Sequence, residues 1–211
     1  MGIDITMLAE RRKQTGGWER AEALAPTSEV YDWYPADDPT QIRVPVYSGR
    51  NYALYDALVW GVAVGPKRPG EEEYVVEPVA RIRGMPADAT GETLAEHADN
   101  VDAYGASWVT TAELAAFDWD QEVLVSATRC MALEPGGEVR GWRTVGVKPE
   151  GEGWAEAGGR YSTRFGAVLQ DFVRPVGMTY REACQHFLAG TLPTLLSFGP
   201  ADEVRIVFWF S

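Results

Sequence analysis

Two carboxylates could carry chemistry in this chain, Asp4 near its start and Asp102 in its middle. If the first strand lay beneath the middle loop, the two could hold a cation, or one of them could act as a general base. A structural alternative exists for Asp4, because an opposite-charge pair with Arg205 on a neighbouring C-terminal strand would contribute about 0.2–1 kcal/mol. The catalytic residues are therefore unknown from the sequence, with Asp4 and Asp102 as the candidates.

The segment SGRN could begin a helix that holds a ligand at its N-terminus. Free backbone N–H groups and the positive end of the helix dipole attract anions, and Arg50 would add a bidentate donor for phosphate or carboxylate. The alternative is structural: Gly49 forms a turn, Asn51 caps the helix and Arg50 pairs with a surface carboxylate. A small anionic ligand is thus one expected partner. The candidate ligand-binding residues are Arg50, Asn51, Tyr52, Tyr104 and Ser107.

The chain has no motif for a metal or a nucleotide cofactor. Its two cysteines, Cys130 and Cys184, and its two histidines show no CxxC or HxxxH spacing. Neither GxxxxGK[ST] nor GxGxxG after a strand occurs. We therefore expect no metal and no cofactor, and we expect both cysteines, which have apolar neighbours, to be free buried thiols.

Negative charge dominates the chain, with 31 acidic against 19 basic residues and a net charge of −12. This balance argues against a nucleic-acid partner, since Lys and Arg make most phosphate contacts. Residues 84–128 contain nine carboxylates and no Lys or Arg. They predict an acidic surface, which either serves solubility alone, binds a basic protein partner or mimics nucleic acid.

The composition is that of a folded protein, because 45% of the residues are apolar and can build a core. No apolar run reaches the ~18 residues of a membrane span, and no basic and apolar leader opens the chain. We expect a cytoplasmic protein with no membrane partner.

The elements that must position the candidates begin with a β-hairpin. Alternating apolar residues, then QTGG and WERAEAL, predict this hairpin over residues 2–24. A loop rich in proline should follow over residues 25–47, with an extended piece at 42–46. Helical spacing after Asn51 predicts a helix near residues 52–61. The residues expected to pin the loop are Tyr31, Trp33 and Tyr34.

The middle of the chain predicts one extended stretch and two helices. Residues 73–83 read as extended, with an interruption at Pro78. One helix should lie within residues 89–101, and a capping box of Thr110 and Glu113 should open the other. Four carboxylates of this region would line one solvated face: Asp88, Glu92, Glu96 and Asp99.

Between residues 124 and 176 strand and helix signals compete and glycines are frequent, so we expect hairpins or loops. A second capping box, Thr179 with Glu182, should open a helix that Gly190 and Pro193 close.

The last strand, residues 204–210, is apolar on both faces and must lie inside a sheet. Strands cluster towards both ends of the chain. We therefore predict an α+β fold in a single domain, residues 1–211, with a mixed or antiparallel sheet that contains both terminal strands and helices packed on it.

Five segments form a set: MGIDI, GRNYALYDAL, RGMP, SWVTTAELAAFDW and the closing VRIVFWF. Together they resemble a family of uncharacterised proteins of bacteriophages and bacteria, which implies a shared architecture without an established activity. The family begins Met-Gly-x-Asp-Ile-His and has histidines before Ser-Trp-Leu-Thr. This chain has Thr6 at the first position and Tyr104 and Gly105 near the others. If the family binds a metal through those imidazoles, this member lacks them, although His97 could substitute.

Two functional classes follow from these observations. We favour an accessory protein of phage or prophage type that binds another macromolecule through its acidic surface. The alternative is a small-molecule or nucleotide-processing enzyme with a cleft formed by Asp4, Arg50, Asn51 and Asp102. The binding protein is favoured because the histidines that would serve acid–base or metal chemistry are missing.

Overall fold

The computed structural model describes residues 3–26, 40–60, 77–133, 139–141, 155–162 and 168–211. Its contacts divide the chain into two compact units. The first comprises residues 1–62, 75–121 and 179–211, and the second comprises residues 63–74 and 122–178. The single domain expected from the sequence stays a prediction, because independent folding is what distinguishes a domain from a compact unit.

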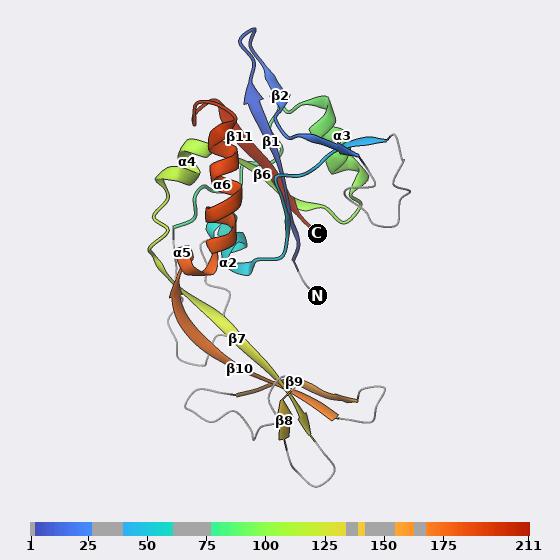
Figure 1. Ribbon diagram of the computed structural model, residues 1–211, viewed down its shortest axis with the longest axis vertical. Helices are drawn as coiled ribbons and strands as arrows, with labels where there is room; N and C mark the ends of the chain where they lie inside the picture. Colours follow the sequence, from blue (N-terminus) through green and yellow to red (C-terminus); the bar gives the residue numbers. More distant parts are fainter. Residues whose placement is uncertain (1–2, 27–39, 61–76, 134–138, 142–154, 163–167) are drawn as a thin grey trace. The chain divides into compact units, whose positions relative to one another are not determined.

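An antiparallel sheet forms the centre of the first unit (Figure 1). Its strands are β1 (Ile5–Arg12), β2 (Trp18–Arg20), β5 (Tyr47–Gly49), β6 (Tyr104–Thr110) and β11 (Val204–Phe210). Their order is β2-β1-β11-β6, and β5 pairs with the same edge of β1 as β2 does. The predicted N-terminal hairpin and the predicted α+β fold with both terminal strands in one sheet are confirmed.

Every residue of β11 is buried, as its two apolar faces predict. Trp209 meets His97 of one helix edge-on at 5.2 Å between ring centroids, whereas Phe210 meets Tyr55 of another at 4.5 Å. Successive strand residues point to opposite faces, so helices cover both sides of β11.

The helices of the first unit are short. They are α2 (Tyr52–Tyr55), η1 (Asp56–Trp60), α3 (Gly91–Asp99), α4 (Thr111–Ala116), α5 (Tyr180–Ala183), η2 (Phe187–Thr191) and α6 (Leu192–Ser197), of which η1 and η2 are π-helical turns. Figure 1 shows α2, α4, α5 and α6 on one side of the sheet and α3 on the other. The predicted cap at Asn51 and both predicted capping boxes are present.

Three local predictions are corrected by the structure. The helix after Thr179 does not stop at Gly190 or Pro193: Gly190 lies within η2, and Pro193 lies in the first turn of α6. Proline is tolerated in the first turn of a helix because its fixed φ suits the helical backbone. Residues 77–83 contain no strand, whereas residues 73–76 of the same predicted stretch lie outside the described residues.

The segment predicted as a loop contains a two-stranded ribbon, β3 (Leu24–Pro26) paired with β4 (Gln41–Arg43). The extended piece thus begins one residue before the predicted range of 42–46 and ends at Arg43 as a strand. The three aromatic residues expected to pin the loop, Tyr31, Trp33 and Tyr34, lie outside the described residues.

The second unit contains one sheet of four strands, β7 (Glu122–Leu133), β8 (Val139–Gly141), β9 (Ala155–Ser162) and β10 (Val168–Thr179), in the order β8-β7-β10-β9. The hairpins expected for residues 124–176 are therefore present as antiparallel pairs. In the described part of the chain, no helix has the length and apolar character needed to cross a membrane.

Candidate functional site

The predicted candidates gather partly at one end of the first sheet. Ile5, at the start of β1, pairs with Gly49 of β5 and with Phe210 of β11, and Phe210 pairs in turn with Tyr104 of β6. The strand ends that carry Asp4, Arg50 and Tyr104 therefore belong to one row across the sheet.

Asp4 and Arg50 form a bidentate ion pair in which Nε and Nη2 of the guanidinium each lie 3.0 Å from a carboxylate oxygen. Both side chains are about half exposed, and the hydrogen bond to Asp4 raises the pKa of Arg50. The predicted pair of Asp4 with Arg205 is wrong. Pairing of β1 with β11 places Arg205 opposite Glu10, at the other end of the strand from Asp4.

Asn51 and Ser107 have structural contacts of their own. The Asn51 side chain accepts a hydrogen bond from the Leu54 N–H and donates one to the Ala183 carbonyl. Ser107 is buried, and its hydroxyl accepts a hydrogen bond of 3.0 Å from the Arg83 N–H. Neither side chain joins the Asp4–Arg50 pair.

The other candidates are exposed. Tyr52 and Tyr104 both present their rings at the surface, and the Tyr104 ring lies 5.9 Å from that of Phe210. Asp102 lies in the turn after α3, where its N–H donates to the Asn100 side chain. The structure thus brings Asp4 and Arg50 into contact and places Asp102 on a separate turn.

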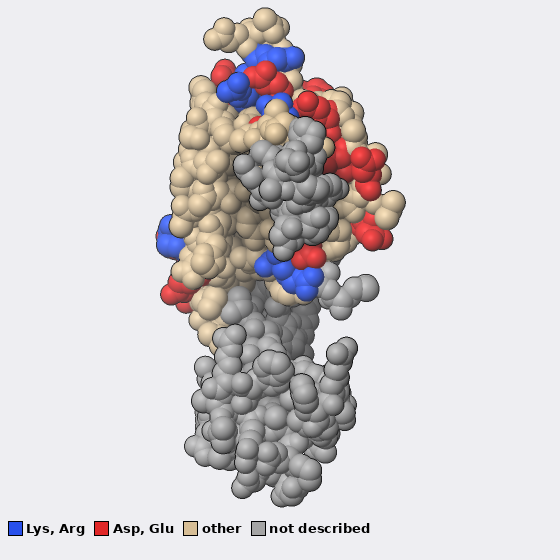
Figure 2. Space-filling view, turned by 45° about the vertical axis from the view of Figure 1, so that its right-hand side comes forward, with Lys and Arg blue, Asp and Glu red and all other residues tan. Residues whose placement is uncertain are grey.

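Arginines from other elements neutralise much of the acidic region, residues 84–128. The ion pairs are Asp88 with Arg205, Glu92 with Arg43, Glu96 with Arg20, Glu113 with Arg83 and Asp120 with Arg181. The face predicted to be solvated therefore carries three of these pairs. Figure 2 shows this mixture: basic and acidic side chains meet at the top, and carboxylates continue along the right-hand margin.

A buried ion pair between Glu10 and Arg205 lies at the centre of a network that the sequence analysis missed. Arg205 donates from Nε to Glu10 at 2.9 Å and from Nη1 to Asp88 at 2.8 Å, and its guanidinium lies 3.9 Å from the Trp18 ring. Glu10 also accepts hydrogen bonds from the Thr90 N–H. The hydrogen bond from Arg205 holds the pKa of Asp88 below its usual value.

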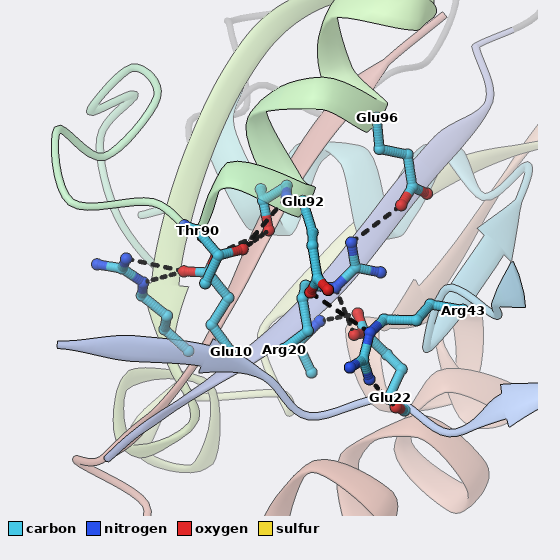
Figure 3. A network of polar contacts seen from close by, with 10 residues as sticks. Glu10, Arg20, Glu22, Arg43, Thr90, Glu92 and Glu96 are labelled. Carbon is cyan, nitrogen blue, oxygen red and sulfur yellow. Dashed lines mark hydrogen bonds and ion pairs between the residues drawn. The ribbon is translucent and has the colours of Figure 1, made fainter. Parts of the chain in front are cut away.

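A second buried cluster lies next to the first (Figure 3). Arg20 donates from Nε to Glu22 at 2.6 Å and from Nη1 to Glu96 at 2.9 Å, and Arg43 donates to the Glu22 carbonyl. The Glu22 carboxylate also accepts a hydrogen bond from the Ala9 N–H. Burial raises the pKa of Glu22, and its bond with Arg20 opposes that rise.

This second cluster borders a pocket of about 540 Å³ between the β3–β4 ribbon and α3. Its lining includes Arg20, Leu24, Ile42, Arg43, Glu92 and Glu96. Nη2 of the buried Arg20 has no hydrogen-bond partner among the residues that the structure describes. Such an arrangement offers both donors and acceptors to a small polar molecule.

One sequence signal could have found the network of Glu10 and Arg205. Glu10 and Arg205 each interrupt a strand whose other central residues are apolar, and β11 was already predicted to be buried on both faces. A charge inside such a strand requires a partner of opposite sign. Arg20 and Glu22 lay outside any such constraint, because the second strand of the hairpin had no predicted cover.

The described residues contain no group of three or more His, Cys, Asp and Glu side chains that could hold a metal ion. Cys184 is a free buried thiol as predicted, and burial raises its pKa to about 12, so it is a poor nucleophile. The expected absence of metal and cofactor stays a prediction. No protein-family model, curated protein or solved structure matches the chain.

Proposed function

We propose that this chain is an accessory protein of phage or prophage type that binds a basic protein partner through an acidic surface. The observation that carries the proposal is the segment from the last residue of α3 to the first residue of β6, residues 99–104, which we call the acidic turn. Asp99 and Asp102 are exposed there. Neither has an ion pair within the part of the chain that the structure describes. The resemblance of the five segments supports the phage or prophage origin.

Exposed apolar side chains lie beside these carboxylates. Val101 is 92% exposed and Tyr104 is 46% exposed. Carboxylates alone would serve solubility, whereas exposed apolar groups next to unneutralised charge favour a protein interface. A partner with a basic rim and a small apolar centre would complement the acidic turn.

Binding of this kind should depend strongly on salt, because charges at an exposed surface are screened beyond about 8 Å at physiological ionic strength. Electrostatic attraction should act mainly on the association rate.

The proposal is tested with fluorescently labelled octalysine as the basic probe, by fluorescence anisotropy at low and physiological salt. The variant Asp99→Asn/Asp102→Asn removes two charges from the acidic turn. Its matched control, Asp118→Asn/Glu122→Gln, removes two exposed charges from elsewhere in the acidic region. We expect the first variant to bind several-fold more weakly than the control, since ~1 kcal/mol is about a fivefold change. Equal weakening by both variants would mean that only net charge matters and would overturn the proposal.

The enzyme alternative has one observation in its favour, the direct contact between Asp4 and Arg50. A guanidinium held by an exposed carboxylate could exchange it for a phosphate or carboxylate ligand. The pocket beside α3 includes neither residue in its lining.

Thermal-shift screening of inorganic phosphate and nucleotides tests this alternative. Arg50→Ala should leave the melting temperature unchanged, because the pair is exposed, but abolish stabilisation by the anion. Arg50→Lys should restore it poorly, since lysine lacks the planar fork. If no anion stabilises the wild type, the enzyme alternative is contradicted.

A further inference from the structure

The pocket beside α3 has the dimensions of a small-molecule site. Its volume of about 540 Å³ falls within the roughly 300–1,000 Å³ usual for ligand pockets. The β3–β4 ribbon supplies one wall, and Glu92 and Glu96 of α3 supply the other.

The charges around the pocket balance. Two guanidinium groups, Arg20 and Arg43, face two carboxylates, Glu92 and Glu96. A simple anion would meet both carboxylates, and a simple cation would meet both guanidiniums. A zwitterion meets a partner of opposite sign at each of its charges, so this lining favours a zwitterion over either.

Hydrogen-bonding capacity remains at both kinds of group. Nη2 of Arg20, in a side chain that is almost fully buried, is a donor without an acceptor in the described part of the chain. Nε of Arg43 lies 3.4 Å from Glu92, which is longer than a good N–H···O bond, and Glu92 is 60% exposed. A ligand could therefore insert at this ion pair without breaking a strong contact.

Apart from Gln41, the rest of the lining is apolar. Leu24, the first residue of β3, is 55% exposed, and Ile42 and Pro45 line the same pocket. An exposed leucine beside a polar cluster suits the side chain of an amphiphilic ligand.

We propose that this pocket binds a free α-amino acid with an apolar side chain. Its carboxylate accepts hydrogen bonds from Arg43 and lies beside the guanidinium of Arg20. Its ammonium group donates to Glu92 and Glu96, and its side chain packs against Leu24. The site does not depend on partner binding by the acidic turn, because it uses different residues.

Isothermal titration with L-leucine tests this proposal. Two derivatives dissect the charges: N-acetyl-L-leucine lacks the ammonium group, and L-leucinamide lacks the carboxylate. We expect each derivative to bind at least tenfold more weakly than leucine, because it lacks the charge-assisted hydrogen bonds of one charged group. Equal affinity of leucine and either derivative would overturn the assignment of a zwitterion. Absence of leucine binding up to about 10 mM would overturn the site.

Variants at the rim of the pocket sharpen the assignment. Arg43→Gln should weaken leucine but leave leucinamide unchanged, whereas Glu92→Gln should weaken leucine but leave N-acetyl-leucine unchanged. A matched control is Arg11→Gln/Glu19→Gln, which removes an exposed Arg–Glu pair outside the pocket and should change nothing. If the rim variants and the control bind leucine equally, the binding lies elsewhere and the proposal is wrong.

Discussion

At the scale of a single residue, Glu10 connects three elements of the first unit: β1, β11 and α3. Its carboxylate, which is fully buried in β1, accepts hydrogen bonds from Arg205 of β11 and from Thr90 and Thr93 at the start of α3. Because these contacts fix a strand pair and a helix together, the network specifies how α3 lies on the sheet. Removing one member of such a buried network lowers the stability of the folded protein, because its partners stay buried without a hydrogen bond.

The variant Glu10→Gln tests this role. Glutamine retains an oxygen for Thr90 but presents an amide to the Arg205 guanidinium, which stays buried with only the largely exposed Asp88 as its counter-charge. We expect the free energy of unfolding in urea to fall by about 1–3 kcal/mol. The control Glu19→Gln, in an exposed pair with Arg11, should cost about 0–1 kcal/mol. Similar losses for both variants would contradict a buried ion pair.

The ion pair of Arg83 with Glu113 makes stability depend on pH. The hydrogen bond from Arg83 lowers the pKa of Glu113 from its usual 4.5. The folded state therefore favours the carboxylate. Its contribution to stability is present above pH 4.5 and is lost as the pH falls from 4.5 through the lowered value.

Glu113→Gln should therefore reduce this acid sensitivity. Glutamine preserves the capping box with Thr110, so only the charge changes. We expect the wild type to lose more unfolding free energy below pH 4.5 than the variant does, measured by urea titrations at each pH. As a control, Glu122→Gln removes an exposed carboxylate and should follow the wild-type profile. Parallel profiles for wild type and Glu113→Gln would contradict the lowered pKa.

At the scale of the element, β6 contains a bulge next to the last strand. Ser107 pairs with Phe208 and Tyr104 with Phe210, so Gly105 and Ala106 stand together opposite Trp209. Gly105 has φ +62°, a left-handed conformation that favours glycine. A Cβ at this position would lie 3.0 Å from the Phe210 ring.

Gly105→Ala should destabilise the protein by about 1–3 kcal/mol, because alanine is strained at positive φ and its methyl group meets a buried ring. Gly91→Ala is the matched control. Gly91 opens α3 with nothing near its would-be Cβ, so alanine there should be neutral or stabilising by about 0.4–1 kcal/mol. Chemical denaturation measures both. Equal effects would mean that the bulge does not require glycine.

The elements that the sequence predicted correctly are those whose signals are local. Thr110 with Glu113 and Thr179 with Glu182 predict their caps because both partners lie within one turn of helix. Local signals did not predict that the helix continues through Pro193. A π-helical turn before this residue leads directly into α6. That continuation depends on buried residues such as Phe187 and Leu195, whose cover is tertiary.

Pairing between distant residues was harder to predict for the same reason. Either Asp4 or Glu10 could pair with Arg205, depending on how the two apolar strands β1 and β11 are aligned. The observed register places Glu10 opposite Arg205. A shift of two residues would bring Arg205 opposite Leu8 or Arg12, which is unfavourable for a buried charge. Of the candidate site, the sequence therefore predicted the local cap at Asn51, whereas the pocket depends on Arg43 and Glu92 meeting across the fold.

At the scale of the whole molecule, residues 122–178 of the second unit are inserted between two segments of the first unit whose ends are hydrogen-bonded to each other. The Tyr180 N–H donates to the Gln121 carbonyl at 3.1 Å, and the Arg181 N–H donates to the Trp119 carbonyl at 2.7 Å. The chain therefore leaves the first unit after Gln121 and returns beside it. The central strands β1 and β11 both belong to that unit.

Replacing residues 122–178 by a short Gly–Ser linker should leave the first unit folded, because the linker joins ends that are already hydrogen-bonded. We expect one cooperative urea transition by tryptophan fluorescence and far-UV circular dichroism, with a smaller denaturant slope because less surface is exposed on unfolding.

Deleting residues 204–211 is the contrasting variant. It removes a fully buried central strand whose aromatic truncations alone cost about 3–5 kcal/mol each, against a total stability of ~5–15, and should give insoluble protein. A cooperative transition in the linker variant would make the first unit a domain by itself and replace the predicted single domain. If the linker variant showed no cooperative transition, the sheet of β7, β8, β9 and β10 would be required for folding. The prediction of a single domain would then hold.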